Sequence, residues 1–474
     1  MASRQVDLEA LKSRLYRVAC EKIASESVAL TRVSRALWEN PELGLQEKQA
    51  EQLLSSFLLS RDFPVIRHHV LPTAFLVTHP DDAQVVSRDV TDGDNDVSNG
   101  SVSVGSCVGN LESSGITDDV RESATPASDD VKHQAVETRS ESRDVSHVAV
   151  FCEYDALPDI GHACGHNLIA VVGLATGLGI AAAIDAAWCE NVTLGKLSII
   201  GSPDEENTCG KVNLLKAGVL EGVDFSLMAH PAMSDDATPN FSGCYSCFAI
   251  FKGTGGSSMN AWYGGGGGNA LDAACLAYQS VACLRQQFRP DWRFHATFKS
   301  GGVHLELVPE RVVIEIYYRA NRLEELRELE SKIFDAFRGA ATACGCSVEY
   351  EMPYPKIDPL ISNDSLVAVY TKHAAALGVN LPQAWGERDP VGCTDMGNVS
   401  QVVPSIHPVF DIGTDSVLHT RDFAAAAGTA TALERSLQQA KVLAMTAIDV
   451  MLTPSVVRAL REDAKRLREK NVQS

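Results

Sequence analysis

The chain has little positive charge and no convincing membrane-spanning run. Its 474 residues include 41 Lys and Arg against 61 Asp and Glu, which gives a formal net charge of −20. Nucleic acids and anionic membrane surfaces are bound through basic faces, so we expect neither as a partner. Residues 168–187 approach the roughly 18 apolar residues of a bilayer span. They are rich in Gly and Ala and lie between motif-bearing segments, which predicts a core helix instead.

The first nine residues also lack the apolar core of a secretion signal and the acid-poor character of a transit peptide, so we expect a cytoplasmic protein. In that compartment the 13 cysteines are predicted to be reduced thiols. Cys244-x-x-Cys247 and Cys344-x-Cys346 have spacings that a zinc ribbon could use. The apolar, strand-like surroundings of Cys247 favour a small buried hydrophobe instead.

The length and the 45% apolar content predict a globular chain of two or three domains. Between residues 81 and 144 there are 15 acidic against 5 basic residues, in a segment dominated by Ser, Asp, Val and Gly. Such a composition buries too little surface to offset its chain entropy. We therefore predict a mostly disordered acidic insertion at 80–146.

Chemistry is concentrated in residues 153–167, which read EYDALPDIGHACGHN. The apolar run 147–152 before them predicts a buried strand, and residues 168–183 after them predict a buried helix. Ligands of open α/β sheets bind where a strand ends in such a loop. Carboxylates, two imidazoles and a thiol in one turn-rich segment indicate a metal site.

Two more predicted strands end in similar chemistry. Residues 194–200 run into Pro203-Asp204-Glu205-Glu206, and residues 224–229 run into His230-Pro231. Of two adjacent carboxylates, one can bind a metal while the other takes a proton from water. Near the C-terminus, either His407 or His419 could complete the site. A helix from about 422 to 452 is predicted to pack on the sheet.

These motifs, in order, resemble the aminoacylase/carboxypeptidase family of co-catalytic metallopeptidases, peptidase family M-20. The branch resembled is the amidohydrolase one, which includes Xaa-Arg (β-alanyl-lysine) dipeptidase. Further matches are WENPELGLQE at 38–47, Asn-Ala-Leu-Asp-Ala at 269–273, Cys-Thr-Asp-Met-Gly-Asn-Val-Ser at 393–400 and Leu-His-Thr-Arg-Asp-Phe at 418–423. The resemblance covers most of the chain, and the acidic insertion is the main stretch without a counterpart.

The resemblance implies an α/β fold in which a helix-flanked, mixed-sheet catalytic domain is interrupted by a smaller α/β lid that mediates dimerisation. The catalytic domain would comprise residues 1–240 and 353–474, and the lid residues 241–352. The site would hold two divalent ions. The thiolate and imidazoles favour zinc, and the carboxylate is also compatible with manganese or cobalt. The implied metal ligands are Cys164, His166, Glu206, His230 and His419, with His407 as the alternative to His419.

The same resemblance implies three further roles. Glu205 would be the general base, taking the proton of the attacking water and passing it to the leaving amine. Asp155 would orient one of the imidazoles, and Arg319 in the lid would bind a substrate carboxylate. The substrate would be a dipeptide or N-acyl amino acid, possibly one with a basic C-terminal residue, and the protein a homodimer.

The lid departs from the family pattern at two positions. Met259 stands where the family carries a histidine that polarises the substrate carbonyl, and Glu306 stands where an asparagine is usual. Losing one such donor typically lowers turnover about 10²–10³-fold. Two hypotheses follow: a metal-dependent dipeptidase or amidohydrolase, and a catalytically weak, metal-binding paralogue that acts as a binding protein.

Overall fold

The computed structural model describes residues 7–80, 145–260, 268–381 and 391–472. The predicted acidic insertion therefore lies, except at its ends, outside the described residues, as does most of the glycine run 264–268. The principal sheet has six strands, in the order β1-β2-β4-β3-β5-β13. These strands are β1 (Val65–Arg67), β2 (Phe75–His79), β3 (His147–Cys152), β4 (Lys196–Gly201), β5 (Phe225–Leu227) and β13 (Ser405–Ile406).

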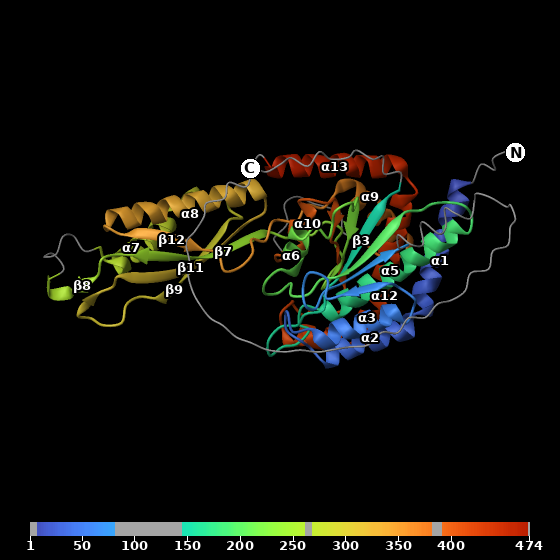
Figure 1. Ribbon diagram of the computed structural model, residues 1–474, viewed down its shortest axis with the longest axis horizontal. Helices are drawn as coiled ribbons and strands as arrows, with labels where there is room; N and C mark the ends of the chain where they lie inside the picture. Colours follow the sequence, from blue (N-terminus) through green and yellow to red (C-terminus); the bar gives the residue numbers. More distant parts are fainter. Residues whose placement is uncertain (1–6, 81–144, 261–267, 382–390, 473–474) are drawn as a thin grey trace, which may run out of the picture. The chain divides into compact units, whose positions relative to one another are not determined.

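The principal sheet is mixed, as predicted: β3 is parallel to β4 and β5, while β2 is antiparallel to β4. Strand β3 alternates between two cores, because Val148 and Val150 face one cluster while Ala149 and Phe151 face another. Helices cover both faces (Figure 1). They are α1 (Leu8–Ser25), α2 (Ser27–Glu39), α3 (Lys48–Leu59), α5 (His166–Trp188), α9 (Asp364–Ala376) and α12 (Ala430–Met451) towards the first cluster, and α6 (Gly210–Lys216) and α10 (Met396–Ser400) towards the second.

Helix α5 is the central helix of this part of the chain. It is long and apolar enough to cross a membrane, but 94% of its most apolar window is buried inside the protein. Its glycines allow close packing, since a Cβ on Gly173 would lie 2.4 Å from the carbonyl oxygen of Phe151 in β3. Burial in the core explains its composition. Helix α12 and the following α13 (Pro454–Val472) pass the same test only if taken together, and they are bent by 95°.

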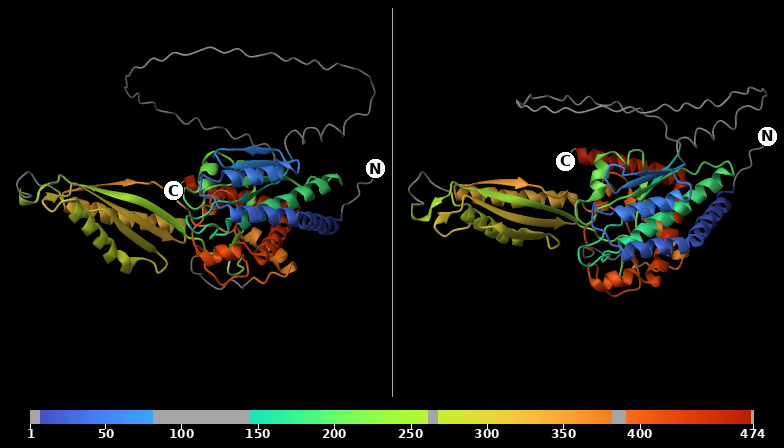
Figure 2. Two further views of the ribbon diagram at one scale, coloured as in Figure 1. Left: turned by 90° about the horizontal axis from the view of Figure 1, so that it is seen from below. Right: turned by 60° about the horizontal axis from the view of Figure 1, so that its bottom comes forward.

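A second, antiparallel sheet in the order β12-β7-β11-β9 has its own core (Figure 2). Alternate residues of β7 and β11, such as Cys247 and Ile314, face that core under α7 and α8. The predicted lid boundaries at 241 and 352 stay a prediction. The elements within them are β7 (Gly243–Lys252), β8 (Gly256–Ser257), η2 (Ser258–Asn260), α7 (Ala270–Leu284), η3 (Arg285–Gln287), β9 (Arg293–Ser300), β10 (Leu307–Val308), β11 (Arg311–Ala320), α8 (Leu323–Ala343) and β12 (Ser347–Glu351).

The prediction of one helix from 422 to 452 was wrong. The segment forms α11 (Arg421–Ala427) and α12, separated at Gly428. A Cβ on Gly428 would lie 2.5 Å from the indole of Trp38, so the chain turns where that ring approaches it. Thr429 then caps α12 by accepting a hydrogen bond from the backbone N–H of Ala432. The remaining short strands are β6 (His230–Ala232) and β14 (Val409–Asp411), which pair in parallel.

Candidate metal centre

The loop between β3 and α5 carries the thiol and the first imidazole. It ends at Gly165, whose φ of +81° is left-handed and suits glycine. A Cβ there would lie 2.5 Å from Cγ of Pro231, so the loop can approach the residue after His230 only because position 165 has no side chain. This close approach brings the ends of β3 and β5 together, as the sequence predicted.

Cys164, His166 and His230 converge, with one potential ligand atom from each lying within 4.8 Å of the others. Nδ1 of His166 lies 2.9 Å from Oδ1 of Asp155, and Nδ1 of His230 lies 2.7 Å from the carbonyl oxygen of Pro231. Each Nδ1–H therefore donates to an oxygen, which leaves both Nε2 lone pairs directed into the cluster. Nε2 of His230 lies 3.3 Å from Sγ of Cys164. This arrangement is typical of metal-binding histidines.

Glu206 and His419 extend the cluster. Nε2 of His419 lies 3.4 Å from Sγ of Cys164 and 3.5 Å from Oε1 of Glu206. His419 has a left-handed backbone, and its N–H donates to the carbonyl oxygen of Ala163, which holds it against the cysteine loop. Oε1 of Glu206 also lies 3.8 Å from Nε2 of His166. All five predicted ligands are thus brought together among the described residues.

The donor set fits divalent cations. Nε2 of His166 and Oε1 of Glu206 are buried and have no hydrogen-bond partner among the described residues. Burying an unpaired polar atom costs about 1–3 kcal/mol. Two such atoms in one cluster therefore indicate that the cluster binds a ligand. One thiol, three imidazoles and a carboxylate suit zinc and are compatible with other first-row divalent ions.

The electrostatics of the cluster point in the same direction. Burial, followed by the charge of Glu206, raises the pKa of the Cys164 thiol well above its ordinary value. Burial alone would lower the pKa of His166, but Asp155 and Cys164 raise it well above the usual range. Burial, followed by the charges of Glu153 and Glu206, raises the pKa of Glu205 well above normal. Burial is the first cause of the raised pKa of both acids, and a bound cation would favour the ionised thiolate and carboxylate that burial disfavours.

Glu205 occupies the place expected of a general base. It follows Asp204, whose backbone is left-handed, at the turn after β4. Its carboxylate lies within 4.8 Å of ligand atoms of His166 and Glu206. The backbone N–H of Glu206 donates to Oδ2 of Asp155 at 3.0 Å, so Asp155 orients this turn as well as the His166 ring.

A buried charge network beside Glu205 was not predicted from the sequence. Lys211, only 1% exposed, lies between Glu153 and Asp395, and its Nζ is 2.6 Å from Oδ1 of Asp395. Those two carboxylates and Glu205 have oxygens within 4.8 Å of one another. Because the Lys211 ammonium already supplies positive charge there, we assign Asp395 no metal. Lys211 is 58 and 184 residues from its partners, so no local pattern could have indicated the network.

The other candidates lie at varying distances from the cluster. The ring of His407 is fully buried, both of its nitrogens lack a partner within the described chain, and its centroid is 5.8 Å from that of His230. No ligand group found among the described residues includes it, so the geometry favours His419. Arg319, on β11, donates from Nε to the Tyr317 hydroxyl at 3.1 Å. Met259 is 84% exposed on η2, and Glu306 is exposed near β10.

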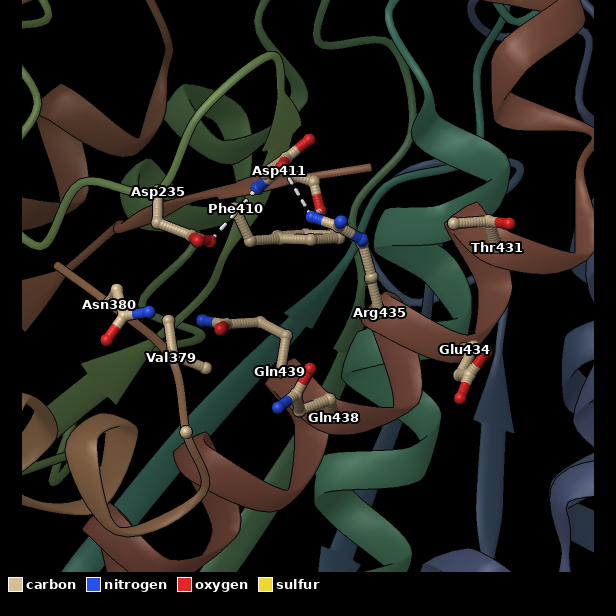
Figure 3. Close-up of a pocket in the computed structure, with 11 residues that line it drawn as sticks. Asp235, Val379, Asn380, Phe410, Asp411, Thr431, Glu434, Arg435, Gln438 and Gln439 are labelled. Carbon is tan, nitrogen blue, oxygen red and sulfur yellow. Dashed lines mark hydrogen bonds and ion pairs between the residues drawn. The ribbon is translucent and has the colours of Figure 1, made fainter. Parts of the chain in front are cut away.

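A cavity of about 550 Å³ lies elsewhere, among Asp235, Asp411, Arg435 and Gln439 (Figure 3). The Arg435 guanidinium is paired with the Asp411 carboxylate, and Oδ1 of Asp235 accepts from the Asp411 backbone N–H at 3.1 Å. Asp235, Asp411 and Arg435 thus have partners within the protein, and the cavity includes no residue of the metal cluster. The catalytic chemistry therefore belongs to the cluster at the strand ends.

Comparison with known proteins agrees with the site. No family model matches the chain. Xaa-Arg dipeptidase of Mus musculus is 35% identical over 469 residues, which cover 98% of this chain and 94% of that protein. Xaa-Arg dipeptidase of Homo sapiens is 35% identical over 467 residues, covering 97% and 93%. A dinuclear metal-binding peptidase of the M20 family from Bacillus subtilis shares the fold, with a TM-score of 0.60, 17% identity and coverage of 91% and 99%.

The fold and the clustered donor groups define a co-catalytic metallohydrolase. More particularly, the chain belongs to the M20 family of metallopeptidases, in the amidohydrolase branch that includes the Xaa-Arg dipeptidases. The family resemblance found from the motifs is confirmed.

Proposed function

We propose that the protein is a dinuclear metal-dependent dipeptidase that releases the C-terminal residue of dipeptides, with a preference for a basic residue at that position. The observation that carries the proposal is the convergence of the five ligand atoms beside Glu205, in a chain similar over nearly its full length to two Xaa-Arg dipeptidases. Cys164, His166, Glu206, His230 and His419 are the proposed ligands, and zinc is the proposed metal.

The mechanism follows from the surrounding groups. Two bound cations would polarise the scissile carbonyl and make a water more acidic. Glu205 takes the proton from the attacking water and delivers it to the leaving amine. Burial, followed by the charges of Glu153 and Glu206, raises the pKa of Glu205 and so helps it hold that proton during the transfer. Asp155 keeps the His166 Nε2 directed at the site throughout.

Substrate binding is assigned to Arg319. Its guanidinium is partly buried against Tyr317, so it loses less water on binding a substrate carboxylate than an exposed arginine would. The excess of acidic groups around the centre favours a cationic side chain in the substrate. Together these features support dipeptides that end in Arg or Lys.

The first test is an assay of chelator-treated protein, with zinc, manganese or cobalt restored separately, against a panel of dipeptides. The panel includes Xaa-Arg substrates, β-alanyl-lysine and neutral dipeptides of matched size. We expect metal-dependent release of the C-terminal amino acid, fastest for basic residues. Bound metal without turnover on any substrate would refute the proposal.

Glu205→Gln tests the base. We expect kcat to fall about 10²–10⁴-fold, since the amide cannot accept the proton, while the metal content stays unchanged. Glu221→Gln, the same substitution at an exposed position, is the matched control and should keep full activity. Unchanged turnover in the Glu205 variant would show that another group is the base.

Met259 favours a second candidate, a metal-binding protein with little turnover, because its thioether has no N–H with which to polarise a carbonyl. Met259→His separates the two candidates. A gain of about 10²–10³ in kcat would show a competent centre that lacks one donor. Unchanged fast turnover would show that the lid donor is not needed, and absence of turnover in both forms would favour the binding protein.

A homodimer formed through residues 241–352 and a cytoplasmic location complete the proposal. Val303, Leu305 and Leu307 are 89%, 99% and 55% exposed, which supports an apolar contact with a second copy. Leu305→Glu should then lower the molar mass measured by light scattering.

All the cysteines that the structure describes are free thiols, which supports a reducing compartment. Imaging of a fluorescent fusion would test the location.

A further inference from the structure

Two cysteines meet where β7 begins. Val391 and Gly392 pair with the chain before β7: the Val391 N–H donates to the carbonyl oxygen of Asn240 at 2.8 Å, and the Ser242 N–H to that of Gly392 at 3.0 Å. This pairing places Cys393 beside the first residues of β7. Cys244 lies opposite Arg319 in the register of β7 and β11, and the hydroxyl of Tyr317, on the same strand as Arg319, lies 3.7 Å from Sγ of Cys393. The two thiols therefore share the same polar neighbours and shift each other's pKa, although 149 positions separate them in the sequence.

The surroundings of the pair differ for the two thiols. Cys393 is partly exposed, whereas Cys244 is only 7% exposed. The hydroxyl of Tyr317 lies 3.7 Å from Sγ of Cys393 and accepts a hydrogen bond from Arg319. The hydrogen bond with Cys244, together with the Arg319 charge, lowers the pKa of Cys393 to about 7 against the opposing effect of burial. The hydrogen bond with Cys393, followed by burial, raises the pKa of Cys244 well above normal.

We propose that Cys393 and Cys244 are a redox modification site, in which a hydroperoxide oxidises the accessible Cys393 and the buried Cys244 resolves it as a disulfide. The proposal rests on the backbone pairing that sets Cys393 beside the start of β7, on the position of both thiols next to Tyr317 and Arg319, and on their unequal exposure. It is independent of the metal cluster, to which neither residue belongs.

The chemistry balances in two steps. The Cys393 thiolate attacks one oxygen of hydrogen peroxide, forming an S–O bond and breaking the O–O bond. The sulfur becomes a sulfenic acid and the other oxygen leaves as water after taking a proton. Sγ of Cys244 then attacks the sulfenic sulfur, its proton leaves with the hydroxyl group as a second water, and the S–S bond forms. Two thiols are oxidised and one peroxide is reduced to two waters.

The other cysteines supply internal comparisons. Cys189, Cys275 and Cys283 are exposed free thiols. Cys247 is fully buried on β7, and its pKa is raised to about 12, mainly by burial. A general reaction of thiols with peroxide would modify the exposed group first. A disulfide needs a partner within reach, which favours the 244–393 pair.

The test uses the full, zinc-loaded protein. It is treated with hydrogen peroxide, alkylated, digested and analysed by mass spectrometry. We expect a peptide pair joined through Cys244 and Cys393, two fewer titratable thiols per chain, and full recovery of both thiols with dithiothreitol. Cys275→Ser, the matched exposed control, should give the same linked pair. Oxidation of Cys189 or Cys275 without a linked 244–393 pair would overturn the proposal.

Single variants separate the roles of the two thiols. In Cys244→Ser, dimedone should trap a sulfenic acid on Cys393, because the resolving thiol is missing. In Cys393→Ser, Cys244 should stay unmodified, because it is buried. Dimedone labelling of Cys244 but not Cys393 would reverse the assignment and refute the proposed order of attack. If one variant does not fold, the other and the linked peptide still decide the outcome.

An effect on turnover is expected if the proposed function also holds. The disulfide would join the start of β7 to the segment that leads into Asp395 and the Lys211 network. We expect peroxide to lower dipeptidase activity and dithiothreitol to restore it, with no such reversal in Cys244→Ser. The thiol readouts do not depend on activity, so failure of the dipeptidase assay would leave this test intact.

Discussion

Replacing Lys211 with Met should destabilise the protein strongly. The ammonium is 1% exposed and contacts Glu153 and Asp395, which are 1% and 0% exposed. Burial alone would lower the pKa of Lys211, but Asp395 and Glu153 raise that pKa by more than burial lowers it. The lysine is therefore charged at neutral pH. Methionine fills a similar volume but leaves two buried carboxylates without their cation. Removing one partner of a buried pair typically costs about 3–5 kcal/mol.

The measurement is urea denaturation followed by circular dichroism, on metal-free protein so that metal binding does not contribute to stability. The matched control is Lys216→Met, at the exposed end of the same helix α6. Surface substitutions of this kind usually change stability by less than about 0.5 kcal/mol. The two variants therefore share a helix and a substitution and differ in burial.

A second variant makes the reasoning refutable. In Lys211→Met/Asp395→Asn the remaining network carries one fewer uncompensated charge, so part of the lost stability should return. The free energy of unfolding of Lys211→Met could instead lie within about 1 kcal/mol of the parent's. In that case Glu153 and Asp395 would be stable without their cation, and the charge of Lys211 would not hold this network together.

Two further predictions concern metal affinity and acid stability. Asp155→Asn should weaken metal affinity about 10–100-fold in a competitive chelator titration, because Asp155 orients the His166 ring. Asp159→Asn, at an exposed position of the same loop, should leave the affinity unchanged. Equal affinities of the two variants would refute the role of Asp155. Asp449→Asn should destabilise the protein near pH 7, because its carboxylate binds His373 and Lys372 at 3.0 and 2.9 Å. Burial opposes ionisation of Asp449, but these hydrogen bonds and the one from Lys12 lower its pKa well below normal. Its contribution is thus present above about pH 4 and lost as the pH falls through the folded value, so the difference in unfolding free energy between parent and variant should shrink in acid.

Local patterns in the sequence predicted the strand–loop–helix segments well. The apolar run 147–152 is β3 with the same bounds, and the ligand-bearing segments follow β3, β4 and β5 as expected, with His230 opening the short strand β6. Period-two burial and turn residues are properties of short segments, so they can be recognised without the fold. Four of the predicted ligands, Cys164, His166, Glu206 and His230, come together for the same reason, since parallel strands end at one edge of a sheet.

What depended on distant contacts could not be predicted. The helix break at Gly428 follows from the approach of Trp38, 390 positions earlier in the sequence. The Lys211 network joins residues from three separate segments. Residue patterns alone left His407 and His419 open and the family resemblance favoured His419, whose imidazole reaches Cys164 across 255 positions. In each case the deciding contact is between residues far apart in sequence.

The close packing of α5 makes the metal centre sensitive to the protein interior. Gly173 and Gly177 lie so close to Phe151 and Ile199 that an added methyl group would push the helix away from the sheet. His166 begins that helix, whereas Glu206 follows the sheet strand β4, so the helix-to-sheet spacing sets the separation between two proposed ligands. Substitutions of core residues far from the metal centre would thus change the distance between the proposed ligands. Metal preference should consequently evolve through interior volume as much as through exchange of the ligands themselves.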